Sequence, residues 1–156
     1  MKKIIFAIII LIFSCSVAKS QKSGFGAGII IGEPTGLSFK SWLSSNTAID
    51  AGAGWSFVKS NSLHIHADYL LHTNSLISSG PGSLPFYYGI GGRIKFSGNE
   101  GGSNETRLGA RIPLGLVYQF STAPVDIFLE VVPVLDLSPL TEFTINSGLG
   151  VRYYFK

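Results

Sequence analysis

The feature that most constrains the fold of this chain is an alternation of apolar and polar residues in segments of about ten residues. Between residues 47 and 57, Ile49, Ala51, Ala53 and Trp55 alternate with polar residues or glycine. Because residues two apart share one face of a strand, each segment predicts a strand with one apolar face. No helical periodicity of useful length follows residue 21. The chain is therefore predicted to be all-β.

Short stretches rich in Gly, Pro, Ser and Asn separate eight such segments, and these residues supply turn geometry and end strand ladders. An even number of strands of this length is typical of a membrane barrel. We therefore predict an eight-stranded antiparallel up-and-down transmembrane β-barrel. The expected strands cover residues 23–32, 36–44, 47–57, 62–72, 85–97, 107–120, 125–137 and 143–155.

Alternation alone leaves open which face of the barrel wall points inward. A soluble, lipocalin-like barrel would enclose the apolar face. However, the interior of an eight-stranded barrel is just wide enough for side chains, and the apolar face carries too many bulky and aromatic residues to fit there. The other face, rich in glycine with scattered charges, does fit. We therefore predict that the apolar face points outward into lipid.

The charged residues within the expected strands all fall on the inward face. His64, His66 and Asp68 share this face with a spacing that suits metal ligands or a proton relay. We favour a structural network instead, because an unpaired buried charge costs several kcal/mol and a narrow lumen forces charges to pair. No metal and no cofactor is expected. The predicted lumen network comprises Lys40, Asp50, His64, His66, Asp68, Arg93, Lys95, Arg111, Asp126, Glu130, Asp136 and Arg152.

Aromatic residues gather near the ends of the expected strands, as interfacial girdles of a membrane barrel do. With both termini in the periplasm, the near rim holds Phe25, Tyr69, Phe86, Tyr88, Tyr118, Phe120, Tyr153 and Phe155. The opposite rim holds Trp55, Phe57 and Phe96. One feature conflicts with this orientation, because the longest connection, 73–84, falls on the periplasmic side, where turns are usually short. Either a neighbouring strand extends into it or the orientation is reversed.

The first twenty residues have the order of an export signal: Lys2 and Lys3, a short apolar run over 4–13, and small residues at Ala18 and Ser20. We predict a signal peptide over 1–20 and a barrel over 21–156. Lipidation of Cys15 is the disfavoured alternative, because Phe13 stands where a small residue is usual.

Removal of this signal changes the charge balance of the chain. The whole chain has a formal net charge of +3, but three lysines, Lys2, Lys3 and Lys19, lie within the signal. The remaining chain therefore carries equal numbers of basic and acidic residues, and a nucleic-acid partner is not expected.

Four segments carry a resemblance to known proteins: Gly36–Lys40, Tyr87–Arg93, Arg111–Gly115 and Gly150–Phe155. On these segments the chain resembles small outer-membrane barrels typified by the OmpA membrane domain and OmpX. It is also similar to uncharacterised outer-membrane barrels of Bacteroidetes and spirochaetes. The resemblance implies contact with outer-membrane lipid, and assembly through a C-terminal strand that the barrel-assembly machinery reads. It further implies a monomer.

We expect a structural or surface-interaction role with a lumen sealed by ion pairs. The sequence does not identify an extracellular protein ligand. A narrow small-solute pore is the alternative. A lipid-modifying enzyme is less favoured, because the second residue after His64 is His66 and the serine nucleophile of such enzymes is missing.

Overall fold

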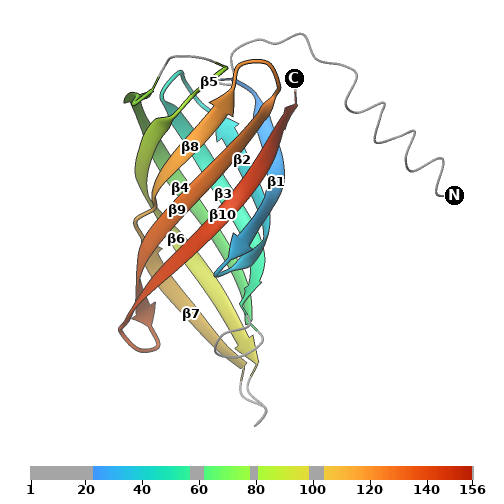
Figure 1. Ribbon diagram of the computed structural model, residues 1–156. Helices are drawn as coiled ribbons and strands as arrows, with labels where there is room; N and C mark the ends of the chain where they lie inside the picture. The colour runs from blue at the N-terminus through green and yellow to red at the C-terminus, as the bar shows by residue number, and fades with distance from the viewer. Residues whose placement is uncertain (1–22, 57–61, 78–80, 99–103, 156) are drawn as a thin grey trace, which may run out of the picture.

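The chain forms a closed all-β barrel in a computed structural model that describes residues 23–56, 62–77, 81–98 and 104–155 (Figure 1). Neighbouring strands are antiparallel, and β1 pairs with both β2 and β10, which closes the barrel. The predicted signal peptide and Cys15 lie outside the described residues. The strands are β1 Phe25–Gly32, β2 Thr35–Trp42, β3 Thr47–Ser56, β4 Ser62–Ser75, β5 Gly82–Ser83, β6 Pro85–Gly98, β7 Asn104–Arg111, β8 Leu114–Phe120, β9 Val125–Ser138 and β10 Glu142–Phe155.

In the part of the chain that the structure describes, no helix has the length and apolar character needed to cross a membrane.

Strands β7 and β8 together form one wall strand that is interrupted at Pro113. Gly91 of β6 pairs with Arg111 of β7, and Tyr88 of β6 pairs with Leu114 of β8, so one register runs along both segments. Proline has no backbone N–H and breaks the ladder locally. The predicted strand over 107–120 therefore keeps one pairing register on both sides of a gap at Pro113. With β7 and β8 counted as one strand, the described wall has eight strands.

The connection between β4 and β6 is more structured than the sequence predicts. Strand β4 runs on to Ser75, three residues beyond its predicted end, and β5 pairs with the last residues of β8. The Leu84 N–H donates to Ser75 Oγ at 2.8 Å, and the Leu76 N–H donates to the Leu84 carbonyl. This segment lies at the same end of the barrel as the start of β1 and the end of β10 (Figure 1).

The strands are staggered by ten residues around the barrel. The position paired with Gly26 across the closing seam is Tyr154 on β10. The same pairing can be followed from Gly26 the other way around the barrel, from β1 through β2 to β9. That path reaches β10 at Thr144, ten residues before Tyr154. That path runs through Lys40, Asp50, Asp68, Gly91, Arg111 and Val134. Such a stagger belongs to a closed barrel whose strands tilt by about 40° and whose interior holds side chains only.

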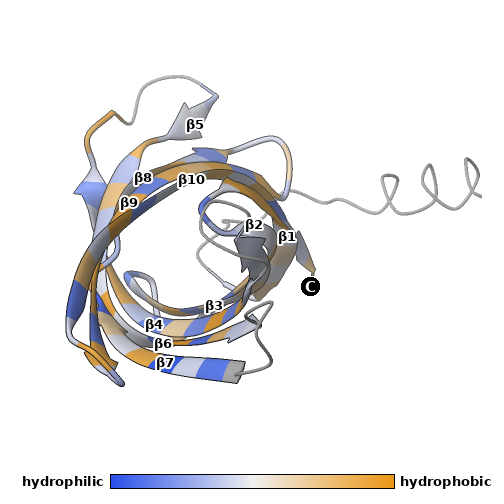
Figure 2. Cartoon of the chain, turned by 90° about the horizontal axis from the view of Figure 1, so that it is seen from below, coloured by the Kyte–Doolittle hydropathy of each residue, from blue (hydrophilic) through white to orange (hydrophobic). Residues whose placement is uncertain are grey.

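The barrel wall is apolar on its outer face and polar on its inner face. Along β9 and β10, Leu129 and Leu149 are more than half exposed, whereas Asp126 and Arg152 are completely buried. Figure 2 shows hydrophobic and hydrophilic residues alternating along the strands in the end-on view. A water-soluble protein has the opposite distribution, and an exposed apolar surface of this extent is found in lipid.

Inward-facing glycines make room for large side chains from neighbouring strands. A Cβ atom at Gly150 would overlap the ring of Phe128, and one at Gly115 would overlap the ring of Tyr87. This complementarity accounts for glycine at these inward positions.

Candidate functional site in the barrel lumen

A buried ion-pair cluster lies near the middle of the lumen, and Arg152 of β10 is its centre. The guanidinium of Arg152 forms ion pairs with Asp50 of β3 and, at 3.2 Å, with Asp126 of β9. It also lies 3.8 Å from the ring centroid of Phe128, a cation–π contact. The Tyr154 hydroxyl donates to Asp126 at 2.6 Å. The two carboxylates are therefore joined through one fully buried cation.

Arg111 provides the second buried cation of this cluster. Its Nε atom lies 3.0 Å from Asp68 Oδ1, and its Nη2 atom lies 3.7 Å from Glu130 Oε1. The Tyr87 hydroxyl donates to Glu130 at 3.1 Å. Because Gly91 stands between β4 and β7 at this level without a side chain, Arg111 can reach Asp68 across it.

A second group of ion pairs lies toward the end of the lumen opposite the termini. Arg93 donates to both carboxylate oxygens of Asp136, at 2.9 and 2.7 Å. Bidentate pairs of this kind are strong and fix the geometry of both side chains. Arg107 pairs with Glu142 and, at 3.0 Å, with Glu105. Arg107, Glu105 and Glu142 were not among the predicted network residues, and they extend the network toward the rim.

Lys40 has a different environment from the one expected for a salt-bridged lysine. Its Nζ atom lies 2.7 Å from His72 Nε2 and 4.5 Å from the ring centroid of Trp42. It also lies over the ring of Tyr87. Lys40 was among the predicted network residues, but His72, Trp42 and Tyr87 were not. All three side chains lie on the inward face of their strands. Their place in the alternation could therefore have identified them as neighbours in the lumen.

Besides Lys40, three predicted network residues take no part in the ion pairs of the described residues. His64 and His66 are buried and meet edge to face with ring centroids 5.4 Å apart. Among the described residues, neither they nor Lys95 has an ion-pair partner. No group of three or more His, Cys, Asp or Glu side chains within the described ranges could hold a metal ion.

An apolar constriction lies beside the central ion pairs. Its residues are fully or almost fully buried and come from five strands: Ile30, Leu70, Tyr87, Val117 and Phe128. Sequence reasoning missed most of this cluster, because β9 and β8 have apolar residues on both faces and the alternation there is weak. The lumen therefore contains hydrophobic packing as well as charge.

The aromatic residues of the predicted girdles are exposed or half-buried on the outer face. At the end with the termini, Phe25 stacks on Phe39 and on Phe155, and Tyr153 meets Phe155 edge to face. Phe86 stacks on Tyr88, and Tyr118 meets Phe120, at the same end. Phe57 lies outside the described residues. The remaining predicted members, Tyr69, Trp55 and Phe96, are exposed.

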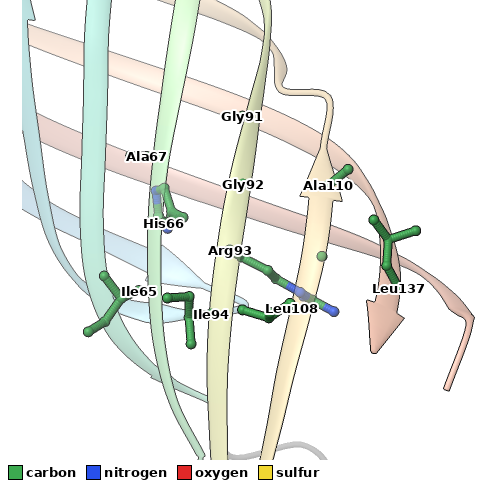
Figure 3. Close-up of a pocket in the computed structure, with 11 residues that line it drawn as sticks. Ile65, His66, Ala67, Gly91, Gly92, Arg93, Ile94, Leu108, Ala110 and Leu137 are labelled. Carbon is green, nitrogen blue, oxygen red and sulfur yellow. The ribbon is translucent and has the colours of Figure 1, made fainter. Parts of the chain in front are cut away.

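A hollow of about 620 Å³ lies against β4, β6 and β7 (Figure 3). Directly paired small residues, Ala67, Gly92 and Ala110, form part of its lining, and Ile65 and Leu108 also line it. Its lining contains no nucleophile beside a base, so the hollow offers no arrangement for covalent catalysis.

The model of a family described as "Protein of unknown function (DUF3996)" matches residues 16–155 of the chain. No curated protein matches the chain. Among solved structures, the chain is similar to the N-terminal β-barrel domain of OprF from Pseudomonas aeruginosa, with a TM-score of 0.59 and 18% sequence identity. The match covers 84% of this chain and 95% of that domain. It supports the predicted all-β antiparallel barrel, which is confirmed.

Proposed function

Since this chain belongs to the DUF3996 family of proteins of unknown function, we propose a role from its own geometry. It is an integral outer-membrane barrel with a structural or surface-interaction role. The observation that carries the proposal is the distribution of side chains, with apolar residues outside and ion pairs inside. The likeness to the OprF barrel domain supports the barrel fold on which the proposal rests.

We further propose that residues 1–20 direct export and are removed, and that residues 21–156 form the mature, monomeric barrel. In the outer membrane the termini then face the periplasm, and the last residues of β1, β3, β6 and β9 lie at the outer end of the barrel. That end is where an extracellular protein ligand would bind.

The lumen of the proposed barrel is closed to solutes. Arg152 joins Asp50 and Asp126 across the interior, and Phe128 and Leu70 pack beside this cluster. A solute that crosses the lumen must break buried ion pairs, and each such separation costs several kcal/mol.

A narrow pore is the second candidate, and one observation favours it. Buried polar side-chain atoms without hydrogen-bond partners, among them His64 Nε2, His66 Nδ1 and Arg111 Nη1, lie in the lumen. Such atoms normally bind water.

Single-channel recording in a planar bilayer decides between the two candidates. The purified full-length mature barrel is expected to give no steady open levels. Reproducible open levels would overturn the sealed lumen and establish the pore.

Lipid modification is not part of the proposed function. His64, His66 and Asp68 are buried inside the barrel, away from the lipid that such an enzyme must attack. Overexpression is therefore expected to leave the acylation of lipid A unchanged, as measured by mass spectrometry. A change in the acyl chains of lipid A would contradict the exclusion of lipid modification.

A further inference from the structure

A cavity of about 160 Å³ lies at the end of the lumen opposite the chain termini. Its lining comes from the turn after β1 and from β3, β6, β7, β9 and β10. Its volume equals that of about five water molecules. The cavity therefore has room for a small solute and is smaller than a typical site for a drug-sized ligand.

Charged side chains of both signs line this cavity, and most of them are already paired with one another. Arg93 holds Asp136 through two hydrogen bonds, and Arg107 pairs with Glu142. These four groups neutralise each other, so they form a rigid frame rather than free binding groups.

Two opposite charges in the lining, Lys95 and Glu33, are not held in a direct ion pair with any residue that the structure describes. Within the described residues, the side chains of Lys95 and Glu33 have neither an ion pair nor a hydrogen bond. Both are partly shielded from solvent. The two therefore face one cavity and attract each other only over a distance longer than that of a direct ion pair.

The side-chain amide of Asn146 provides an independent observation. Asn146 of β10 is 6% exposed, and its side-chain Nδ2 atom is buried without a hydrogen-bond partner. An unpartnered buried donor is costly, and a ligand acceptor would satisfy it. Asn146 lines the same cavity as Lys95 and Glu33.

We propose that this cavity binds a small zwitterion. The anionic group of the ligand accepts hydrogen bonds from Lys95 and Asn146, and its ammonium group donates to Glu33. A simple anion would complement only Lys95 and a simple cation only Glu33, so a zwitterion is favoured over both. A free amino acid and a phosphoethanolamine group share this chemistry.

The test is an NMR titration of the full mature barrel, refolded in detergent micelles and labelled with ¹⁵N. Glycine and phosphoethanolamine are the zwitterionic probes, and acetate and methylammonium are the single-charge controls. Saturable shifts confined to Glu33, Lys95, Asn146 and their neighbours are expected with at least one zwitterion, and binding at least ten times weaker with both controls. Tighter binding of glycine would identify the ligand as a free amino acid, and tighter binding of phosphoethanolamine would identify it as a phosphoethanolamine group.

Two variants test the roles of the individual charges. Lys95→Met and Glu33→Gln are each expected to weaken zwitterion binding by at least tenfold. Glu105→Gln removes a charge that does not line the cavity, and it is expected to leave the affinity unchanged. Heat-modifiable mobility on a gel verifies that each variant is folded.

The proposal is overturned if neither zwitterion gives saturable shifts with the wild-type barrel. It is also overturned if acetate or methylammonium binds as tightly as the zwitterions, or if both cavity variants retain the wild-type affinity. The wild-type ligand series remains decisive even if a variant fails to fold.

Discussion

Arg152 of β10 forms an ion pair with Asp50 of β3, a strand three positions away around the barrel. The pair therefore spans the lumen instead of joining adjacent strands. It ties two parts of the wall that share no backbone hydrogen bonds. A second carboxylate, Asp126, lies on the other side of the same guanidinium.

Replacing this cation is expected to destabilise the barrel strongly. Arg152→Met keeps an apolar side chain of similar length but leaves Asp50 and Asp126 buried without their cation. The free energy of unfolding should fall by about 3–5 kcal/mol. Urea titration of the barrel in lipid vesicles, followed by heat-modifiable gel mobility, measures this change. Glu105→Gln, at the partly exposed rim, should change it by less than about 0.5 kcal/mol. A loss below 1 kcal/mol for Arg152→Met would argue against a structural role for the cluster.

The inward glycines are expected to be far less tolerant than an outward one. A Cβ atom at Gly28 would overlap the backbone of Val151 on β10, so Gly28→Ala should prevent closure between β1 and β10. At the outward Gly92 the nearest atom to an added Cβ is 3.7 Å away, so Gly92→Ala should fold normally. The folded fraction on an unheated gel measures both variants. Equal yields would contradict this account of barrel closure.

The apolar constriction is expected to contribute to both stability and closure. Phe128→Ala combined with Leu70→Ala removes two completely buried side chains from the lumen. The Phe128 substitution alone should cost about 3–5 kcal/mol. The double variant should also show open events in planar-bilayer recordings. Leu129→Ala, on the outward face of the same strand, should show none. A silent double variant would mean that the ion pairs alone close the lumen.

The last aromatic residue of β10 is expected to matter for assembly. Phe155 contacts Phe25 across the closing seam and Tyr153 on its own strand. Phe155→Ala should lower the amount of folded barrel in outer-membrane fractions several-fold, if the barrel-assembly machinery reads this end. Phe143→Ala removes an exposed aromatic from the other end of β10 and serves as the control. Similar reductions for both variants would contradict a specific role of the C-terminal end.

Strand positions and the two faces of the wall could be predicted from the sequence, because the alternation in strands such as β3 and β10 has a period of two. The effect of a proline within a strand was harder to predict. Pro113 lies inside a predicted strand, and the structure keeps the register on both sides of it. The extension of β4 to Ser75 was one of the two alternatives for the 73–84 connection. The sequence could not choose between them, because a side-chain hydrogen bond and irregular backbone pairing, not apolar alternation, hold this segment.

Partners across the lumen could not be predicted from the sequence. Which charges meet depends on the stagger of the closed barrel, and no local pattern encodes that stagger. Arg93 and Asp136 were both predicted to face inward, but their pairing was not. Glycine at positions such as Gly91 also decides how far an arginine can reach.

The chain contains two tryptophans, and they test the orientation of the wall directly. Trp55 is exposed on the outer face, and Trp42 is buried in the lumen against His72. Trp42→Phe leaves Trp55 as the sole indole, and Trp55→Phe leaves Trp42. Each variant is refolded into vesicles of lipids brominated at different depths along the acyl chain, and tryptophan fluorescence is measured. Strong quenching of Trp55 and little quenching of Trp42 is the result expected of an apolar outer face in lipid. Quenching of Trp42 with protection of Trp55 would contradict the proposed outward-facing apolar wall.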